Sequence, residues 1–213
     1  MGKNKIVLLF SGGIDSTVLY YWLNATDYDV FPIHINYGQT TYLGEINAIK
    51  RITEGMFKRD TLFVDVPNLK EIGQGSLVGE LPESVYSQDE WMKNEFFPNR
   101  NMILISIAAS YAYKMNINKL AIGVAGENSY KDTGSAFIKS ITNTLYESLN
   151  LFEIVTPFVD KDRKFVVNES QILNVPIEKT FSCNSLGERH CMLCNSCLDR
   201  QHALDLLGIA NAF

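Results

Sequence analysis

The chain has 213 residues, of which 46% are hydrophobic and 20% are charged, and its formal net charge is −5 at pH 7. This length allows one substantial hydrophobic core with a small appended module, and the composition is typical of a globular enzyme. The negative charge argues against a nucleic-acid binder, whose affinity comes mainly from neutralising phosphates, and no apolar run reaches the roughly 20 residues that span a bilayer. Because residues 1–5 lead straight into a strand-like segment, with no room for a signal peptide, we expect a cytoplasmic protein with no nucleic-acid or membrane partner.

Strand-like and helix-like segments alternate along most of the chain. Short apolar runs bounded by turn residues predict strands, and apolar residues at helical spacing predict helices. The predicted strands are 6–10, 30–36, 61–66 and 120–124, and the predicted helices begin at Thr17 and cover 45–58, 102–115 and 136–149. This order predicts the α/β fold class, with a doubly wound parallel sheet covered by helices on both faces.

Polar and small residues stand at or just after the ends of the predicted strands, namely Ser11, Tyr37, Asp65 and Gly123. In open parallel sheets, ligands bind at the carboxyl ends of the strands. We therefore expect these four residues to share one cleft.

The segment 68–99 interrupts this periodicity, since it carries several glycines and two prolines and only a short predicted helix at 89–95. It is either a solvated surface excursion or a mobile lid that closes over a nucleotide. For the chain as a whole we predict an ATP-binding α/β domain at 1–160. A helical, zinc-binding segment at 161–213 is expected to pack on the same domain.

The most informative stretch is FSGGIDS at residues 10–16, between the first predicted strand and the first predicted helix. Adjacent glycines let the backbone approach a ligand closely, and a helix N-terminus beside the hydroxyls of Ser11 and Ser16 favours an anion. Asp15 would repel a bare phosphate, so we expect a divalent cation between its carboxylate and phosphate oxygens. The alternative is an ordinary capped turn. The loop resembles the SGGxDS loop of the ATP pyrophosphatases, which cleave ATP between the α and β phosphates and transfer AMP to a substrate oxygen.

All four cysteines lie close together near the end of the sequence, at Cys183, Cys191, Cys194 and Cys197. Four thiolates complete a tetrahedral zinc shell with no open position, which is typical of a structural site. An iron–sulfur cluster is the main alternative, because C-x2-C-x2-C also occurs in ferredoxins, and unliganded cysteines are a third. Disulfides suit a cytosolic chain poorly. A zinc ion here would hold the surrounding segment so that its side chains can wall a pocket.

Taken together, these motifs resemble the 7-cyano-7-deazaguanine synthase family of the adenine nucleotide α-hydrolase superfamily, over nearly the whole chain. The segments that carry the resemblance are the loop 11–16, residues 36–39 with Glu45 (family pattern (D/N)YGQxHxxE), residues 97–101 (F-V-P-G-R-N), and residues 180–183 with 191–200 (T-x-S/T-C…C-G-x-C-x-S-C-x-x-R). The resemblance implies a Rossmann-like nucleotide-binding fold with the C-terminal zinc segment.

The family's chemistry implies an ATP-dependent enzyme. The carboxylate of 7-carboxy-7-deazaguanine becomes an acyl adenylate, and ammonia displaces AMP to give an amide. A second ATP then adenylates the amide oxygen, and loss of AMP leaves a nitrile. The resemblance thus implies ATP, Mg2+ and Zn2+ as bound groups, ammonia and a 7-deazaguanine as small-molecule partners, and a homodimer.

The resemblance also assigns roles to individual residues. The catalytic residues would be Asp15, Ser16, Arg100 and Lys164, the last at the position of the family's K-A-E-type lysine. The ATP-binding residues would be Phe10, Ser11, Gly12, Gly13, Ile14, Asp15, Ser16, Tyr37, Gly38, Gln39 and Arg100. The substrate-binding residues would be Asn101, Gly123, Lys131, Asp132 and Thr133.

The chain departs from the family pattern in two loops. The family's G-Y-P-D-C-R run corresponds here to residues 129–134, which keep Asp132 but carry Thr133 and Gly134 in place of Cys and Arg. The Asp132 carboxylate suits the N–H donors of a guanine-like edge, with a plain turn aspartate as the alternative, and Lys131 would replace the arginine as a point charge. Met192 replaces the glycine of C-G-x-C.

The altered substrate loop leaves three functions open. The first is the nitrile synthase. The second is a deazaguanine ligase that joins the adenylate to an amine of a protein partner, as some relatives in bacterial antiviral operons suggest. The third is a non-catalytic nucleotide-binding protein, which the intact loop at 11–16 disfavours.

Overall fold

The computed structural model describes residues 3–54, 59–79, 95–125, 130–150, 153–184 and 187–209. Within these ranges, five parallel strands form a sheet in the order β3-β2-β1-β4-β5. The strands are β1 (Asn4–Leu9), β2 (Tyr28–Asn36), β3 (Leu62–Asp65), β4 (Lys119–Ile122) and β5 (Glu153–Val155). The order of the strands reverses between β1 and β4, where Leu9 pairs with Ile122, and this is where open α/β sheets bind ligands.

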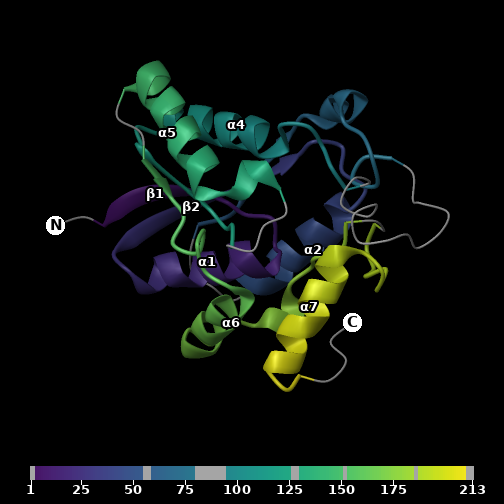
Figure 1. Cartoon of the computed structure of the whole chain (residues 1–213). Coiled ribbons are helices and arrows are strands. Elements are labelled where there is room, and N and C mark those ends of the chain that lie inside the picture. The colour runs from purple at the N-terminus through teal and green to yellow at the C-terminus, as the bar shows by residue number, and fades with distance from the viewer. Residues whose placement is uncertain are drawn as a thin grey trace.

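Helices cover both faces of the sheet, as the sequence predicted (Figure 1). The helices are α1 (Ile14–Ala25), α2 (Tyr42–Thr53), α4 (Arg100–Lys114), α5 (Ser135–Leu149), α6 (Arg163–Ile172) and α7 (Asn195–Leu206), with short 3-10 turns η1 (Pro67–Ile72), η2 (Lys131–Thr133) and η3 (Ile177–Lys179). The predicted strands and helices are confirmed, with two differences at helix ends. α1 begins at Ile14 rather than Thr17. α2 ends at Thr53, and residues 55–58 of its predicted range 45–58 lie outside the described residues. The predicted short helix at 89–95 lies almost entirely outside the described residues. In the part of the chain that the structure describes, no helix is long and apolar enough to cross a membrane.

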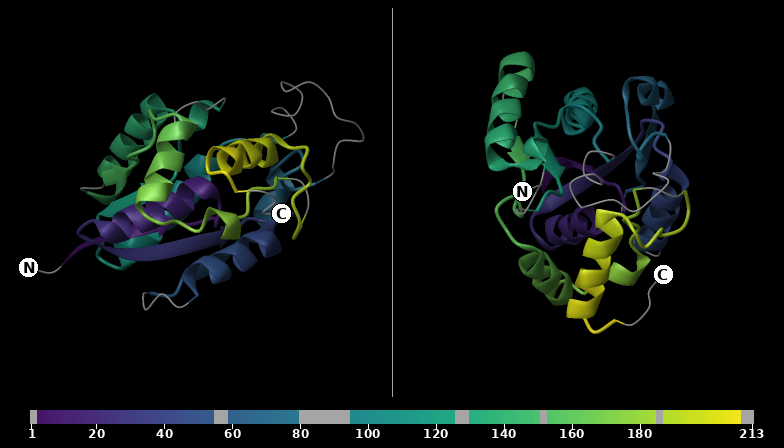
Figure 2. Two further views of the ribbon diagram at one scale, coloured as in Figure 1. Left: turned by 90° about the horizontal axis from the view of Figure 1, so that it is seen from below. Right: turned by 45° about the vertical axis from the view of Figure 1, so that its right-hand side comes forward.

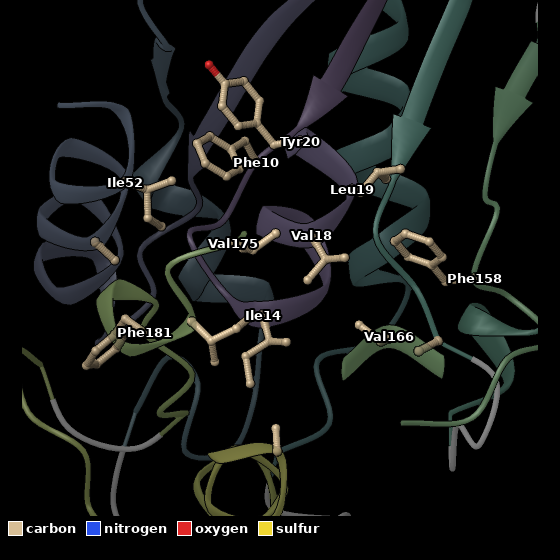
Figure 3. Packing of buried hydrophobic residues seen from close by; sticks show 14 of the residues in the cluster. Phe10, Ile14, Val18, Leu19, Tyr20, Ile52, Phe158, Val166, Val175 and Phe181 are labelled. Carbon is tan, nitrogen blue, oxygen red and sulfur yellow. The ribbon is translucent and has the colours of Figure 1, made fainter. Parts of the chain in front are cut away.

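The alternation of side chains along β1 builds two cores. Ile6 and Leu8 pack with α1, α2, α6 and α7 on one face, and Val7 packs with α4 and α5 on the other. Figure 3 shows the first core, in which Phe10 at the end of β1 stacks on Tyr20 of α1 with ring centroids 5.1 Å apart. The two cores hold the end of β1, and with it the loop that follows, between rigid layers.

The C-terminal segment packs against the same body as the N-terminal strand. Figure 2 shows α7 beside α6, and buried residues of both helices belong to the core that contains β1 and α1. Arg200 of α7 is completely buried and donates hydrogen bonds to the carbonyls of Ile177 (3.0 Å) and Glu178 (3.1 Å) and to the hydroxyl of Thr180. Since a buried charge is tolerated only when its donors are paired, these bonds fix α7 on η3.

Candidate active site

A cavity of about 840 Å³ lies at the carboxyl ends of β1, β2 and β4. Its walls include the first turns of α1 and α4 and residues of α6 and α7. The residues predicted from sequence that line it are Phe10, Ser11, Gly13, Ile14, Asp15, Ser16, Tyr37, Gln39, Arg100, Asn101, Gly123 and Thr133. Asp65 was expected in the same cleft but does not line it: its carboxylate accepts hydrogen bonds from Asn36 (2.9 Å) and Tyr42 (3.4 Å) at the edge strand β3.

The loop after β1 is closed by its own serine hydroxyls. Ser16 Oγ lies 3.1 Å from Ser11 Oγ and donates to the carbonyl of Gly13 (3.1 Å), while the Gly13 N–H donates to Ser11 Oγ (3.3 Å). Gly13 is the N-cap of α1 and provides no side-chain cap, so the first helical amides are available to an anion. Gly12 has φ +74, and a Cβ there would lie 3.1 Å from the Glu45 carbonyl oxygen. Gly12 therefore packs against α2 and does not line the cavity.

An arginine between two carboxylates lies next to this loop. Arg163, the first residue of α6, forms ion pairs with Asp15 and with Asp199 of α7, whose Oδ2 lies 2.7 Å from Arg163 Nη2. Burial lowers the pKa of Arg163, but Asp15 and Asp199 outweigh it and raise the pKa above its ordinary value. All three side chains line the cavity. The guanidinium therefore stays charged and fixes the two carboxylates at the wall.

Lys164, predicted as catalytic, is exposed and does not line the cavity. Asp162 caps α6 by accepting a hydrogen bond from the Phe165 N–H (2.8 Å), which sets the rotation of the first turn. Successive residues of a helix differ by about 100° in direction, at 3.6 residues per turn. Arg163 therefore faces the cavity and Lys164 faces solvent. The residue that lines the cavity is thus the one directly before the lysine that the sequence interpretation put forward.

The turn after β2 is held together by a buried network. Gln39 accepts from the Tyr37 N–H (2.8 Å) and donates to Glu45 Oε2 (2.9 Å), and His34 Nε2 lies 3.3 Å from the same oxygen. Gly38 has φ +87 and packs so closely on η1 that a Cβ would lie 2.4 Å from the Pro67 carbonyl oxygen. The Gln39 side chain thus fixes the backbone of the turn at Tyr37 as well as lining the cavity. Gly38 lies outside the cavity.

The predicted substrate residues separate into two groups. Asn101 and Thr133 are buried and line the cavity, whereas Lys131 and Asp132 do not line it, and Lys131 is exposed. Asp132 Oδ2 instead accepts a hydrogen bond from the Asn101 N–H (3.4 Å), and its carbonyl accepts from Asn101 Nδ2 (3.1 Å). The carboxylate at the start of α4 therefore orients this helix. Gly123 is close enough to α1 that a Cβ would lie 2.7 Å from the Ser16 nitrogen.

Part of the predicted lid is packed against the site. Leu77 is buried with Tyr37 and Phe97 and lines the cavity, and its carbonyl accepts from the Thr40 N–H (2.9 Å). Residues 80–94 of the segment lie outside the described ranges.

The four cysteine sulfurs lie within 4.8 Å of one another. A tetrahedral zinc site with Zn–S bonds of about 2.3 Å places its sulfurs about 3.8 Å apart, and the Sγ atoms of Cys191 and Cys197 are 3.9 Å apart. Backbone amides also point at the sulfurs, with the Cys194 N–H 3.3 Å from Cys191 Sγ and the Cys197 N–H 3.4 Å from Cys194 Sγ. The cluster can therefore hold one metal ion through four thiolates.

Comparison with known proteins identifies the family. A family model described as "Queuosine biosynthesis protein QueC" matches residues 5–208. The chain belongs to the QueC family. It is 51% identical over 207 residues to 7-cyano-7-deazaguanine synthase 1 of Desulfitobacterium hafniense (strain Y51), covering 97% of this chain and 94% of the relative. It is 35% identical over 213 residues to 7-cyano-7-deazaguanine synthase of Archaeoglobus fulgidus, covering 96% and 87%.

Among solved structures, a 4-thiouridine synthetase in complex with RNA and ATP matches with a TM-score of 0.51 at 17% identity, covering 96% of this chain and 52% of that chain. This likeness supports the ATP pyrophosphatase fold of the QueC-family chain and nothing more specific.

Several cavity residues of this QueC-family chain were missed from the sequence. They are His34, Glu95, Arg163 and Asp199. For Arg163 a signal existed, because an aspartate directly before it is a typical helix N-cap. The other three carry no local signal, since each reaches the cavity only through tertiary packing.

Met192, which replaces the glycine of the family pattern, adopts φ +64 in the loop between Cys191 and Cys194 of the cysteine cluster. This left-handed conformation costs a non-glycine residue about 1–2 kcal/mol. We expect Met192→Gly to raise the free energy of unfolding by about 1 kcal/mol, and the melting temperature by about 2–4 °C, after allowing for the greater chain entropy of glycine. Thermal unfolding of the metal-loaded protein measures this. Leu193→Gly is the matched control, because Leu193 is exposed but has no positive φ. This control should lower the free energy of unfolding. A lower free energy of unfolding in Met192→Gly would contradict the interpretation.

Proposed function

We propose that this protein is an ATP-dependent 7-cyano-7-deazaguanine synthase, a ligase that forms carbon–nitrogen bonds. The observation that carries the proposal is the 51% identity, over 97% of the chain, to an enzyme of that name. Ser11 and residues 13–16, which line the cavity, support it, because this is where AMP transfer from ATP would take place.

The reaction proceeds in two rounds of AMP transfer. In the first, a carboxylate oxygen of 7-carboxy-7-deazaguanine attacks the α-phosphorus of ATP and pyrophosphate leaves. Ammonia then attacks the acyl carbon, loses a proton, and AMP leaves with the former carboxylate oxygen, giving the amide. In the second round the amide oxygen attacks the α-phosphorus of another ATP and pyrophosphate leaves. Loss of AMP, with the former amide oxygen, and of the two N–H protons then gives the nitrile.

The chain contributes charge and position. The amides of the loop and of the first turn of α1, with Ser11 and Ser16, bind the pyrophosphate that leaves. Arg100 supplies a second positive charge at the opposite wall; burial lowers its pKa, but Tyr37 and Asp132 raise it above the ordinary value, so it stays cationic. Arg163, rather than Lys164, is the basic catalytic residue of this segment.

Two metal ions fit side chains that are present. Asp15 and Asp199 are carboxylates at the cavity wall, the donor type that Mg2+ takes together with phosphate oxygens, and a Mg2+ ion there would neutralise developing charge on the phosphates. Zn2+ fits the four cysteines, where it would brace the loop and take no part in the chemistry. The division into 1–160 and 161–213, the lid, the homodimer and the cytoplasmic location stay predictions.

Mass spectrometry of the products formed from ATP, ammonium and 7-carboxy-7-deazaguanine tests the function. We expect 7-cyano-7-deazaguanine, with two AMP and two pyrophosphate released for each nitrile, because each round consumes one ATP. Amide that accumulates without nitrile, or a protein whose mass increases in a lysate, would favour the ligase with a protein acceptor. No AMP under any of these conditions would favour a non-catalytic protein.

A further inference from the structure

Glu95 is a buried carboxylate in the cavity wall that the proposed mechanism does not use. Its side chain is 4% exposed and lines the cavity just before the start of α4. Oε2 accepts a hydrogen bond from Asn184 Nδ2 (3.1 Å). Oε1 has no hydrogen-bond partner among the described residues. Since an unpaired buried acceptor is costly, the missing donor is expected to come from a ligand.

Two side chains that carry donors, Asn184 and Arg100, lie near Glu95. Asn184 Nδ2 also donates to Ser196 Oγ (2.8 Å), and Arg100 is near enough for its positive charge to act on Glu95. An ammonium ion needs several acceptors around it and would be repelled by Arg100. A neutral ligand that presents N–H donors beside a carbonyl oxygen suits this mixture, because it can donate to Glu95 and accept from the guanidinium.

The same end of the cavity offers flat and apolar surface. Tyr130 lines it and stacks on Phe96 with ring centroids 6.4 Å apart, and Leu193 lines it as well. The negative charge of Glu95 acts on Tyr130, whose pKa burial and this charge raise to about 12, so its hydroxyl stays protonated. A planar heterocycle is the ligand shape that such a wall accommodates.

We propose that Glu95 selects the guanine-like ring of the substrate, with Oε1 accepting hydrogen bonds from the ring N–H and the exocyclic amino group. The inference rests on the proposed function and adds the residue that recognises the guanine-like ring of the substrate. The sequence predicted that the Asp132 carboxylate binds the guanine-like edge. Asp132 does not line the cavity, and it orients Asn101 instead.

The test compares two substrates in Glu95→Gln, which replaces one acceptor oxygen by a donor amide. The substrates are 7-carboxy-7-deazaguanine and its analogue without the 2-amino group. We expect the KM for the guanine-type substrate to rise about 10- to 100-fold, the loss typical of a hydrogen bond to a charged group, and the wild-type preference over the analogue to disappear. The KM for ATP and the bound zinc should not change. Glu147→Gln, on the exposed side of α5, is the matched control and should behave as wild type.

Four results would overturn the assignment of Glu95. An equal loss for both substrates would indicate a structural role, and a rise confined to the KM for ammonium would place the amine at Glu95. A wild-type protein that converts neither substrate would remove the proposed function, and the inference with it. An active wild type with an unaffected Glu95→Gln variant would remove the inference alone.

Discussion

Asp15→Ala is expected to lower the rate of ATP consumption by at least about 100-fold, the loss typical of removing one electrostatic contact to a transition state. Asp15 lies in the first turn of α1, lines the cavity and forms an ion pair with Arg163. The substitution removes a carboxylate that we propose as a Mg2+ ligand and also releases the Arg163 guanidinium from one of its two partners. Release of AMP and pyrophosphate, followed with saturating substrate and ammonium, measures the effect.

The neighbouring cations provide the comparison for this prediction. Arg163→Ala should lose activity to a similar extent, because Arg163 lies in the wall between Asp15 and Asp199. Lys164→Ala should retain it, because Lys164 is exposed on the other side of the same turn. Full activity in Asp15→Ala would remove the metal role assigned to this carboxylate, and a loss in Lys164→Ala alone would restore the original interpretation of the motif.

Cys194→Ser is expected to remove the bound metal and to destabilise the fold by at least about 3 kcal/mol, since metal binding to such a site is coupled to folding. For a chain of this size the melting temperature should fall by about 6–12 °C. The reason is local: Cys194 is completely buried at the N-cap of α7, and α7 carries Asp199 into the cavity. Metal analysis by mass spectrometry and thermal unfolding measure the two effects.

The identity of the metal is decided by the same experiment. Wild-type protein should carry about one zinc ion per chain, and Met192→Gly, which keeps all four thiolates, should carry the same amount. Iron with visible absorbance in the purified protein would make the zinc assignment wrong. Unchanged stability in Cys194→Ser would show that the cluster holds no structural metal.

Local patterns were enough to predict the strands β1 to β4 and the helices α1, α2, α4 and α5. The apolar run at 6–10 and the glycines after it mark β1 and its loop, because burial on both faces selects apolar side chains and the turn selects glycine. β5, with three residues, is too short to show a period. The start of α1 was placed too late because Gly13, without a side-chain cap, gives no N-cap signal.

The sequence by itself determined the family, the α/β fold, the loop at residues 11–16 and the cysteine cluster, because each depends on residues close together in the chain. Only the tertiary structure decided which distant residues complete the cavity. Arg163 lies 148 residues from Asp15, and Asn184 lies 89 residues from Glu95. Such pairs depend on how α6 and α7 pack on α1 and on the ends of the strands. Helix packing also decides the direction of each side chain, which is why Arg163 lines the cavity while its neighbour Lys164 does not.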